Sequence, residues 1–379
     1  MLRVPFAKPD MTESEAKAAY DQVLSGKLTG CGKVTEFEEA LKDFLGADRV
    51  VCLDSNTAAI ELCLKAMGIG RGHKVATTPF TYSATADAPI NLGAHVKFID
   101  LERGTFEMDY DMVPGGVSAV IPVDYAGIPC DYKRLRGYDG LVIADAAHSF
   151  GATINGKRVW EDADFMAFSF HAVKGLTTGG EGGALVWNDL HGVDNNELED
   201  RIRLLAEHGQ TRKGMSGIEG REWEYNIECI GKNHIMTDVD AAIGIEQLKS
   251  HEKNLAERER VAKLYYRHLP GEVDYTCHHG EGWTSAMHLF PIKLRGFSES
   301  MRNRVYSYMK SHGIDCNVHY KPLPMMTAYR NLSYDISYYP EAYAAYCDLL
   351  TLPFYGSLGE TEVKVVCSTL KEAIDAVRK

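Results

Sequence analysis

The sequence predicts an α/β protein whose larger part is built on a mostly parallel sheet. Short apolar runs of strand length alternate with helical segments through the first half of the chain, and this alternation is typical of parallel sheets covered by helices. Several runs end in polar residues, and such sheets carry their sites at the carboxyl ends of the strands. The predicted strands cover residues 74–78, 95–101, 118–123, 141–145, 165–170 and 184–187.

Two helices are predicted near the start of the chain. Residues 12–15 and 35–38 both read Thr-x-x-Glu, which is the pattern of a capping box at a helix N-terminus. Gly26 and Gly46 follow the two segments, and glycine is the common residue just past a helix end. An apolar run at 50–53 then predicts the next strand.

A charged amphipathic stretch at 251–269 predicts the helix that joins two domains, with its charges on a solvated face. We therefore expect a large domain at 1–250 and a smaller α/β domain at 251–379 that includes this helix. The other elements predicted for the small domain are strands at 287–294 and 315–318 and a final helix at 360–377.

Composition is that of an ordinary globular protein. The chain has 379 residues, of which 45 % are hydrophobic and 25 % charged, enough for two domains with a sizeable core. The formal net charge of −12 argues against general nucleic-acid binding, because phosphate backbones are held by basic surfaces. No apolar run has the length of a signal peptide or a membrane span, so we expect a cytoplasmic protein that does not enter a membrane.

Cysteine and histidine usage indicates no metal centre. The nine cysteines are odd in number, scattered and free of CxxC spacing, which favours reduced thiols over disulfides or a zinc site. The histidines are dispersed, and the adjacent pair His278 and His279 is expected in a solvated loop.

Lys174 stands where an apolar run stops and small residues begin. An amine that attacks an aldehyde must be held rigidly and kept partly unprotonated, and the end of a buried strand at a glycine-rich turn offers both conditions. Alone the pattern is weak, because a lysine after a strand is more often a solvated surface charge.

Asp145 ends the short apolar strand that precedes His148. A buried carboxylate needs a partner, and the pyridinium nitrogen of pyridoxal phosphate (PLP) is a suitable one, because the carboxylate keeps the ring protonated as an electron sink. The alternative is that Asp145 caps a helix that follows the strand.

Ser55, Asn56 and Thr57 lie where the strand at 50–53 turns into an amphipathic helix. Free backbone amides and the helix dipole at such a turn favour a phosphate group. A plain capped helix start explains the same residues equally well.

The order of these features resembles the fold-type I PLP enzymes. More narrowly, the chain is similar to the sugar aminotransferase family called DegT/DnrJ/EryC1/StrS, and the resemblance covers nearly its whole length. The segments that carry it are 4–6, 26–30, 79–86, 145–148, 233–238 and 318–322.

The resemblance implies four roles around the ring of PLP. Lys174 would carry the cofactor and move the proton during transfer, and Asp145 would pair with the pyridine nitrogen. Tyr82 would stack on the ring face, although an aromatic residue there also fits an ordinary core. His148 would lie near the phenolic oxygen of the ring.

Other residues would hold the phosphate of the cofactor. The resemblance gives this role to Ser169 together with the turn at 55–57. Asn233 would reach the phosphate bound by the neighbouring subunit, which makes the active sites shared within a homodimer.

The chain departs from the family pattern at two places. Gly175 follows the lysine where asparagine is common, and 178–183 contains an extra glycine, so the loop after Lys174 is open to a different path. Asn56 replaces the glycine of the usual Ser-Gly-Thr; either it tolerates a left-handed backbone or the phosphate cup shifts slightly.

The resemblance implies an aminotransferase that cycles between PLP and pyridoxamine 5'-phosphate. An amino acid, most often L-glutamate, would give its amino group to a nucleotide-linked keto-sugar. The segment 318–322 favours C4 of a 4-keto-6-deoxyhexose carried by UDP or another nucleoside diphosphate. His319 and Lys321 are candidates for binding this anionic substrate.

Alternatives remain open at this point. A cyclitol ketone such as an inosose, or a C3-keto sugar, is another acceptor, and the sequence does not fix the sugar, carbon, nucleotide or pathway. A PLP lyase would need a mobile reactive cysteine, and none stands out. A non-catalytic PLP-binding regulator would have lost Lys174 or Asp145, and both are present.

Overall fold

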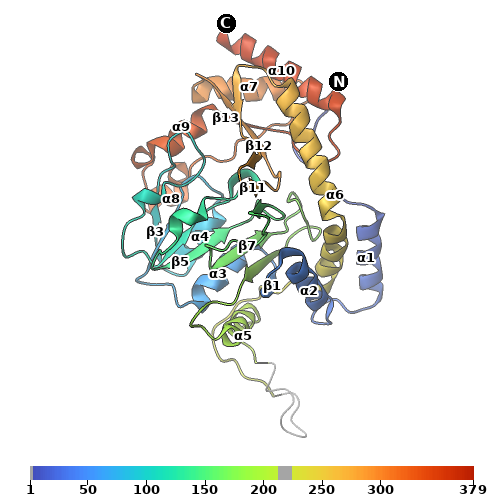
Figure 1. Cartoon of the computed structure of the whole chain (residues 1–379), viewed down its shortest axis with the longest axis vertical. Helices are drawn as coiled ribbons and strands as arrows, with labels where there is room; N and C mark the ends of the chain where they lie inside the picture. The colour runs from blue at the N-terminus through green and yellow to red at the C-terminus, as the bar shows by residue number, and fades with distance from the viewer. Residues whose placement is uncertain (1–2, 212–223) are drawn as a thin grey trace.

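The computed structural model describes residues 3–211 and 224–379, and a seven-stranded sheet lies at its centre (Figure 1). The strand order is β1-β8-β7-β5-β4-β2-β3. Strand β8 runs antiparallel to β1 and β7, and the other neighbours pair in parallel, so the predicted α/β class with a mostly parallel sheet is confirmed. The strands are β1 (Arg49–Leu53), β2 (Lys74–Thr77), β3 (His95–Phe98), β4 (Ala119–Ile121), β5 (Leu141–Asp145), β7 (Phe165–Ser169) and β8 (Gly183–Trp187).

Helices cover both faces of this sheet, which is why most of its strands read as continuous apolar runs. The edge strand β3 differs, because its alternate residues are exposed. Alternate strand residues face opposite sides: Val51 packs in a cluster with α3 and α5, and Val50 in a cluster with α2 and α6. The helices around the sheet are α1 (Glu13–Leu24), α2 (Lys33–Leu45), α3 (Asn56–Ala66), α4 (Ala84–Asn91), α5 (Asn195–Ala206) and α6 (Asp238–His268).

One of the two predicted capping boxes is confirmed. The Thr12 side chain caps α1 and Glu15 returns a bond to the Thr12 amide. The second prediction is wrong, because α2 begins two residues before Thr35, after Gly32 with φ +102°. Glu38 therefore lies inside α2, where it is buried and accepts two bonds of 3.0 Å from Arg203.

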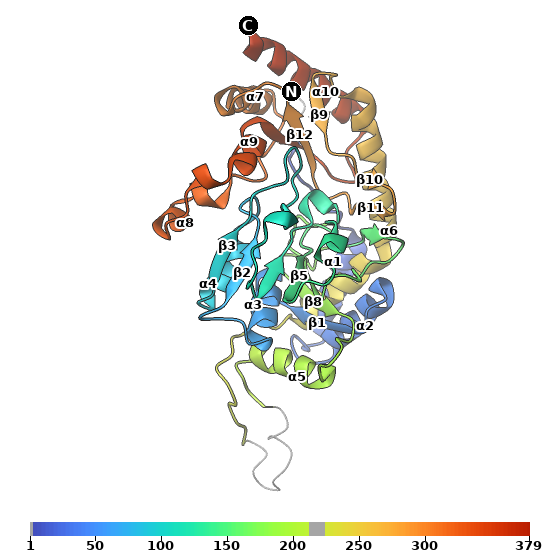
Figure 2. The same ribbon diagram turned by 60° about the vertical axis from the view of Figure 1, so that its left-hand side comes forward.

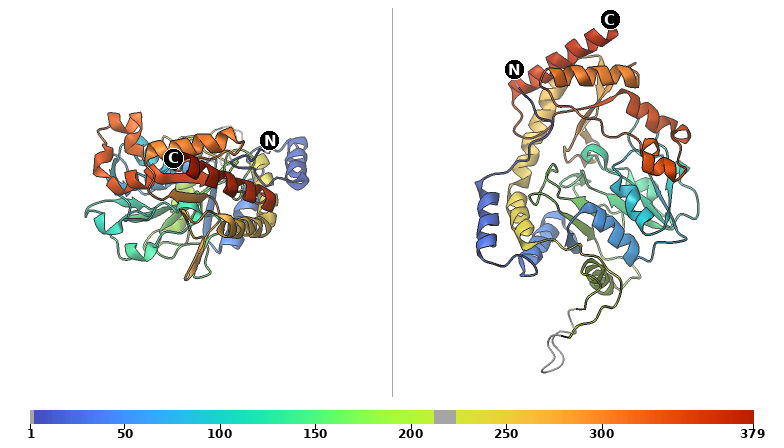
Figure 3. Two further views of the ribbon diagram at one scale, coloured as in Figure 1. Left: turned by 90° about the horizontal axis from the view of Figure 1, so that it is seen from above. Right: turned by 180° about the vertical axis from the view of Figure 1, so that it is seen from behind.

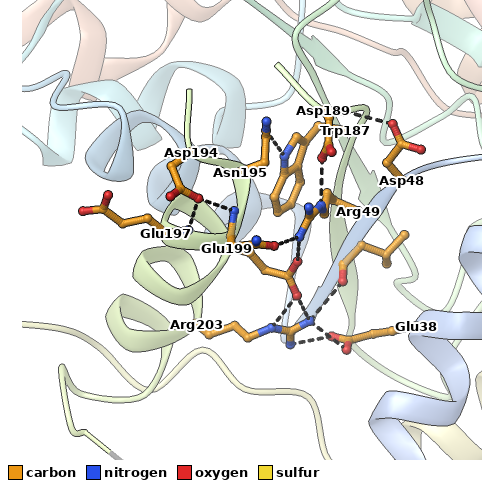
Figure 4. Close-up of polar contacts among 12 residues, drawn as sticks. Glu38, Asp48, Arg49, Trp187, Asp189, Asp194, Asn195, Glu197, Glu199 and Arg203 are labelled. Carbon is orange, nitrogen blue, oxygen red and sulfur yellow. Dashed lines mark hydrogen bonds and ion pairs between the residues drawn. The ribbon is translucent and has the colours of Figure 1, made fainter. Parts of the chain in front are cut away.

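Arg203 belongs to a polar network that fastens α5 to the first strand (Figure 4). It bonds Glu38 of α2 and Glu199 of its own helix, and Glu199 also pairs with Arg49 of β1 at 3.1 Å. Such charge-assisted bonds are the stronger kind. Glu38 therefore holds α2 against α5 through Arg203 and does not cap a helix N-terminus.

The linking helix is longer than predicted. α6 starts after Thr237 and spans 31 residues, packing on α1 and α2 early in its length and on α10 near its end (Figure 1). Its charges are not all solvated, because Arg258 is 4 % exposed and lies 3.7 Å from the Asp10 carboxylate. The helix runs through the predicted boundary at 250/251, and that boundary stays a prediction.

The C-terminal residues form a second, three-stranded antiparallel sheet in the order β13-β12-β9. The strand predicted at 287–294 is β12, and the final helix is confirmed as α10. Residues 315–318 do not form a strand; Asn317 makes one bridge to Thr351. The elements here are β9 (Val273–Tyr275), β12 (Phe290–Leu294), β13 (Leu349–Leu352), α7 (Glu299–Ser311), α8 (Thr327–Asn331), α9 (Pro340–Asp348) and α10 (Glu360–Arg378), with α8 and α9 to one side (Figure 2).

The start of the chain joins this C-terminal core. Val4 is fully buried and pairs in parallel with Ile314, through bonds of 2.9 Å to Gly313 and 3.0 Å from Asp315. The two ends of the described chain accordingly lie at the same end of the molecule (Figure 3).

A small sheet of the order β10-β11-β6 lies between these parts. The expectation of a solvated loop is wrong for His278, which is fully buried and bonds Ser285 at 2.8 Å, while His279 is exposed. The remaining elements are β6 (Thr153–Ile154), β10 (His279–Gly280), β11 (Trp283–Thr284) and the 3-10 helices η1 (Tyr110–Met112), η2 (Tyr125–Gly127), η3 (Tyr132–Leu135), η5 (Leu323–Met325) and η6 (Ile336–Tyr338).

Across 3–211 and 224–379, no helix is both long and apolar enough to cross a membrane. The same residues contain no group of three or more His, Cys, Asp or Glu side chains placed to hold a metal ion. All nine cysteines are free thiols.

Candidate active site

The carboxyl ends of β5 and β7 and the start of α3 meet at one edge of the large sheet. The Asn56 side chain joins all three, because its amide donates to the Ala167 carbonyl at 2.7 Å and to the Asp145 carboxylate at 3.3 Å. The turn that the sequence assigns to phosphate thus lies directly beside the strand that ends in Asp145.

Asp145 is 4 % exposed and its carboxylate is well held. Thr85 donates to it at 2.6 Å and the Ala147 amide at 3.2 Å. Burial raises the pKa of Asp145, and the Thr85 bond is the strongest of the contacts that oppose this rise. No helix follows β5, so the reading of Asp145 as a helix cap is wrong.

Lys174 lies in the loop between β7 and β8, which is closed by backbone bonds. Its amide donates to His171 at 2.9 Å, and Ala172 donates to Gly180 at 2.9 Å. The residue is half-buried, and burial lowers the pKa of Lys174 to about 8 against the opposing charge of Asp145. A lysine in this state is not a plain solvated charge, because a larger fraction of its amine is unprotonated near neutral pH than in an ordinary lysine.

Two glycines allow the loop to close on the start of α3. At Gly182 (φ +152°) a Cβ atom would lie 2.2 Å from the Thr178 hydroxyl, and at Gly183 it would lie 2.4 Å from the Ser55 backbone. Side chains at these positions would push the lysine loop away from the helix start.

The residues predicted to hold the phosphate group lie at the start of α3 and at the end of β7. Ser55 caps α3 by accepting from the Ala58 amide at 3.2 Å, and Thr57 is half-buried in the first helical turn. Asn56 is the first residue of α3, is absent from the residues with positive φ, and turns its side chain toward Asp145. Ser169 is 8 % exposed at the end of β7. The helix start keeps unpaired amides and a positive dipole end for an anion.

Tyr82 is an aromatic residue left open to solvent. Its side chain is 65 % exposed, and its ring centre lies 6.2 Å from that of Tyr320. The reading of Tyr82 as core is therefore wrong, and an exposed ring beside buried polar groups suits a planar ligand.

His148 is 8 % exposed and contacts a residue that the sequence did not single out. Its Nε2 atom lies 3.1 Å from the Tyr320 hydroxyl, and its Nδ1 atom has no partner among the described residues. Burial, and next the charge of Lys174, hold the pKa of His148 well below its usual value. Tyr320 stands between His319 and Lys321, so the motif that supplied those two candidates also contained it.

The two substrate candidates differ in their surroundings. His319 bonds Thr351 at 3.1 Å, and its carbonyl accepts from Tyr125 at 2.5 Å. Burial, with the charge of Lys174, lowers the pKa of His319 to about 4, so this ring is neutral at physiological pH. Lys321 is exposed. Of the two, Lys321 alone offers a positive charge.

Asn233 lies apart from these residues. It is exposed and forms a bridge with Glu207, and within the described ranges no bond joins it to Lys174 or Asp145. Its neighbour His234 contacts Asp54 at 2.9 Å, beside the helix start. The role of Asn233 at a partner subunit stays a prediction.

The groups at this edge fit PLP. They include an amine with a lowered pKa, a buried carboxylate with donors on both oxygens, an exposed aromatic ring and a helix N-terminus, and an imidazole nitrogen that is buried without a partner in the described part of the chain. Together with the α/β fold they define a PLP-dependent enzyme of fold type I.

The chain belongs to the DegT/DnrJ/EryC1/StrS aminotransferase family, whose family model matches residues 9–371. The enzyme is thus a PLP-dependent aminotransferase. Among similar proteins, "UDP-4-amino-4,6-dideoxy-N-acetyl-beta-L-altrosamine transaminase" of Campylobacter jejuni is 32 % identical over 96 % of this chain and 94 % of its own. "Uncharacterized protein MJ1066" of Methanocaldococcus jannaschii is 31 % identical over 99 % of this chain and 98 % of its own.

Solved structures agree with this assignment. The "Putative sugar aminotransferase Spr1654" from Streptococcus pneumoniae, in its PMP-form, superposes with a TM-score of 0.94 at 34 % identity, covering 99 % of this chain and 100 % of that one. Its PLP-form gives a TM-score of 0.93. Helicobacter pylori PseC has the same fold, with a TM-score of 0.87 at 24 % identity over 99 % of this chain and 100 % of its own.

Proposed function

We propose that this aminotransferase moves an amino group from L-glutamate to C4 of a 4-keto-6-deoxyhexose carried by UDP or another nucleoside diphosphate. The observation that carries the chemistry is the Lys174 amine, with its lowered pKa, in the same site as the buried Asp145 carboxylate. The acceptor rests on relatives: the Campylobacter transaminase named above, and "GDP-perosamine synthase" of Caulobacter vibrioides, 29 % identical over 98 % of both chains.

Lys174 is the proton carrier of this proposal. Bound PLP supplies an electron sink for the charge released when the α-proton of an amino acid is removed. Burial keeps part of the Lys174 amine free to take up that proton, and the protonated amine then returns it to the product side. Thr85, Asn56 and the Ala147 amide hold the Asp145 carboxylate in one orientation throughout.

Tyr82 and the segment 318–322 would receive the substrates. The open ring of Tyr82, whose centre lies 6.2 Å from that of Tyr320, would cover one side of the site. Because His319 is neutral at physiological pH, it would contribute hydrogen bonds, and Lys321 would contribute charge toward the diphosphate.

The proposal includes a homodimer that works in the cytoplasm, with Asn233 completing the partner's phosphate site. Mixing the inactive variants Lys174→Ala and Asn233→Ala tests this directly. Shared sites require that activity reappears after subunit exchange, because one site of each mixed dimer then contains neither change. Two variants that stay inactive after proven exchange would place Asn233 within its own subunit.

The first experiment follows the absorption spectrum of the protein with PLP before and after L-glutamate. Loss of the visible band, growth of the pyridoxamine phosphate band and release of 2-oxoglutarate are expected, and Lys174→Ala should show none of them. Cofactor binding without any response to amino donors would favour a lyase or a regulator.

The acceptor is then identified with the aminated enzyme. UDP- and GDP-linked 4-keto-6-deoxyhexoses, a 3-keto nucleotide sugar and an inosose are offered in turn, and return of the visible band reports transfer. The proposal requires the highest kcat/KM with a 4-keto nucleotide sugar. A higher value with the inosose or the 3-keto sugar would reject the C4 assignment.

A further inference from the structure

His288 packs against His148 and has no role in the proposed function. The two ring centres are 4.4 Å apart with planes tilted by 42°, and His288 is 6 % exposed. His148 thus contacts two rings, that of His288 and that of Tyr320, whose hydroxyl lies 3.1 Å from the His148 Nε2 atom.

The backbone fixes His288 in this position. Its amide donates to the Ala126 carbonyl at 3.2 Å, and the preceding Met287 has a φ of +53°. At Gly127 (φ +94°) a Cβ atom would lie 3.0 Å from both the His148 carbonyl and the His288 amide. The loop after β5, the helix η2 and the segment before β12 are therefore in contact around the pair of rings.

The ring of His288 is unsuited to proton transfer. The pKa of His288 is held well below its usual value. The largest cause is burial, followed by the charges of His148, Lys174, Arg258 and His319. Its Nδ1 atom is buried without a partner in the described part of the chain. An imidazole that stays neutral with this nitrogen unused contributes mainly through its shape.

We propose that His288 is a positioning residue that acts through His148, because its ring keeps the His148 imidazole in one orientation in the cofactor site. The inference rests on the proposed function and on the place near the phenolic oxygen of the cofactor ring that the family resemblance implies for His148. Loss of the His288 ring would leave a space into which His148 turns, and small errors of placement in a site are costly to catalysis.

Three variants of the full-length protein with PLP separate this role from simple folding. His288→Ala removes the ring, and His288→Phe keeps a ring without nitrogens. His278→Ala is the matched control, since His278 is also buried but bonds Ser285 and stacks on Phe354. The readouts are the visible circular dichroism of the bound cofactor, kcat and KM for L-glutamate, and the melting temperature.

We expect His288→Ala to weaken the cofactor dichroism and to lower kcat about tenfold with little change in KM. His288→Phe should restore both, and His278→Ala should lower the melting temperature alone. In a His148→Ala background, His288→Ala should cause no further change in dichroism.

Two results would overturn the inference. The first is unchanged dichroism in His288→Ala. The second is a His288→Phe protein as impaired as His288→Ala, because a ring nitrogen and not the shape of the ring would then be required. A wild-type protein without any visible cofactor signal would reject the proposed function itself. The two failures are therefore distinguishable.

Discussion

The hydroxyl of Thr85 is expected to set the protonation of Asp145. It donates at 2.6 Å to a carboxylate that is 4 % exposed. A hydrogen bond to a charged group contributes about 1.5–3 kcal/mol, and 1.4 kcal/mol corresponds to about one pKa unit. Thr85→Val should therefore raise the pKa of Asp145 further above its already raised value.

The sign of the pH effect follows from this shift. Since Asp145 must be ionised to pair with the pyridinium nitrogen, affinity for PLP is lost as the pH falls through the pKa of Asp145. In Thr85→Val this loss begins at a higher pH, so the midpoint moves upward by about one to two units. The assay is the dissociation constant of PLP, measured by absorbance between acidic and neutral pH.

Thr77→Val is the matched control. Thr77 is fully buried in the same sheet and donates to the Ile121 carbonyl at 2.7 Å, away from Asp145. It should lower the free energy of unfolding by about 1–3 kcal/mol through the unpaired carbonyl and leave the midpoint of PLP binding unchanged. Equal midpoints in wild type and Thr85→Val would refute the reasoning.

Three further outcomes are expected. The rate of PLP association with the apo-protein should rise with pH around a midpoint of about 8, because burial lowers the pKa of Lys174 to that value. Asp145→Asn should move this midpoint to lower pH, because the carboxylate charge that raises the Lys174 pKa is gone. A flat pH profile in stopped-flow absorbance would contradict this expectation. Tyr82→Ala should weaken PLP binding by about 1 kcal/mol. Tyr338→Ala removes another exposed tyrosine, 76 % accessible, and should leave the dissociation constant of PLP unchanged. Equal effects of the two substitutions would show that Tyr82 does not contact PLP. Arg203→Met should lower the free energy of unfolding in urea by about 2 kcal/mol, less than the loss of a fully buried pair, because the Arg203 side chain is 39 % exposed. Arg136→Met breaks an exposed pair with Asp162 and should lower the free energy of unfolding clearly less. Similar losses in the two variants would show that the burial of Glu38 is unimportant.

The sheet was predictable because most of its strands are buried on both faces and so read as uninterrupted apolar runs. Helix starts were predictable where the cap is local, as at Thr12, whose partners lie within three residues. The prediction at Thr35 failed for the opposite reason. Glu38 is held by Arg203, 165 positions away, and a local pattern contains no information on that contact.

The site divides in the same way. Asp145 and Lys174 were predictable because each stands at the end of an apolar run. Thr85 and Tyr320 were not selected, since they act on Asp145 and His148 across 60 and 172 positions of sequence. The motif at 318–322 contained Tyr320, but only the fold brings its hydroxyl to the imidazole.

The burial of Val4 against Ile314 also bears on how the protein is made. The core that encloses Val4 contains residues as late as Val377 of α10. The ribosome synthesises the chain from the N-terminus to the C-terminus, so the residues around Val4 emerge long before their partners near the C-terminus are made. Contacts so distant in sequence form slowly. We therefore expect this core to close only after synthesis is complete, and the segment around Val4 to remain open to proteases and chaperones until then.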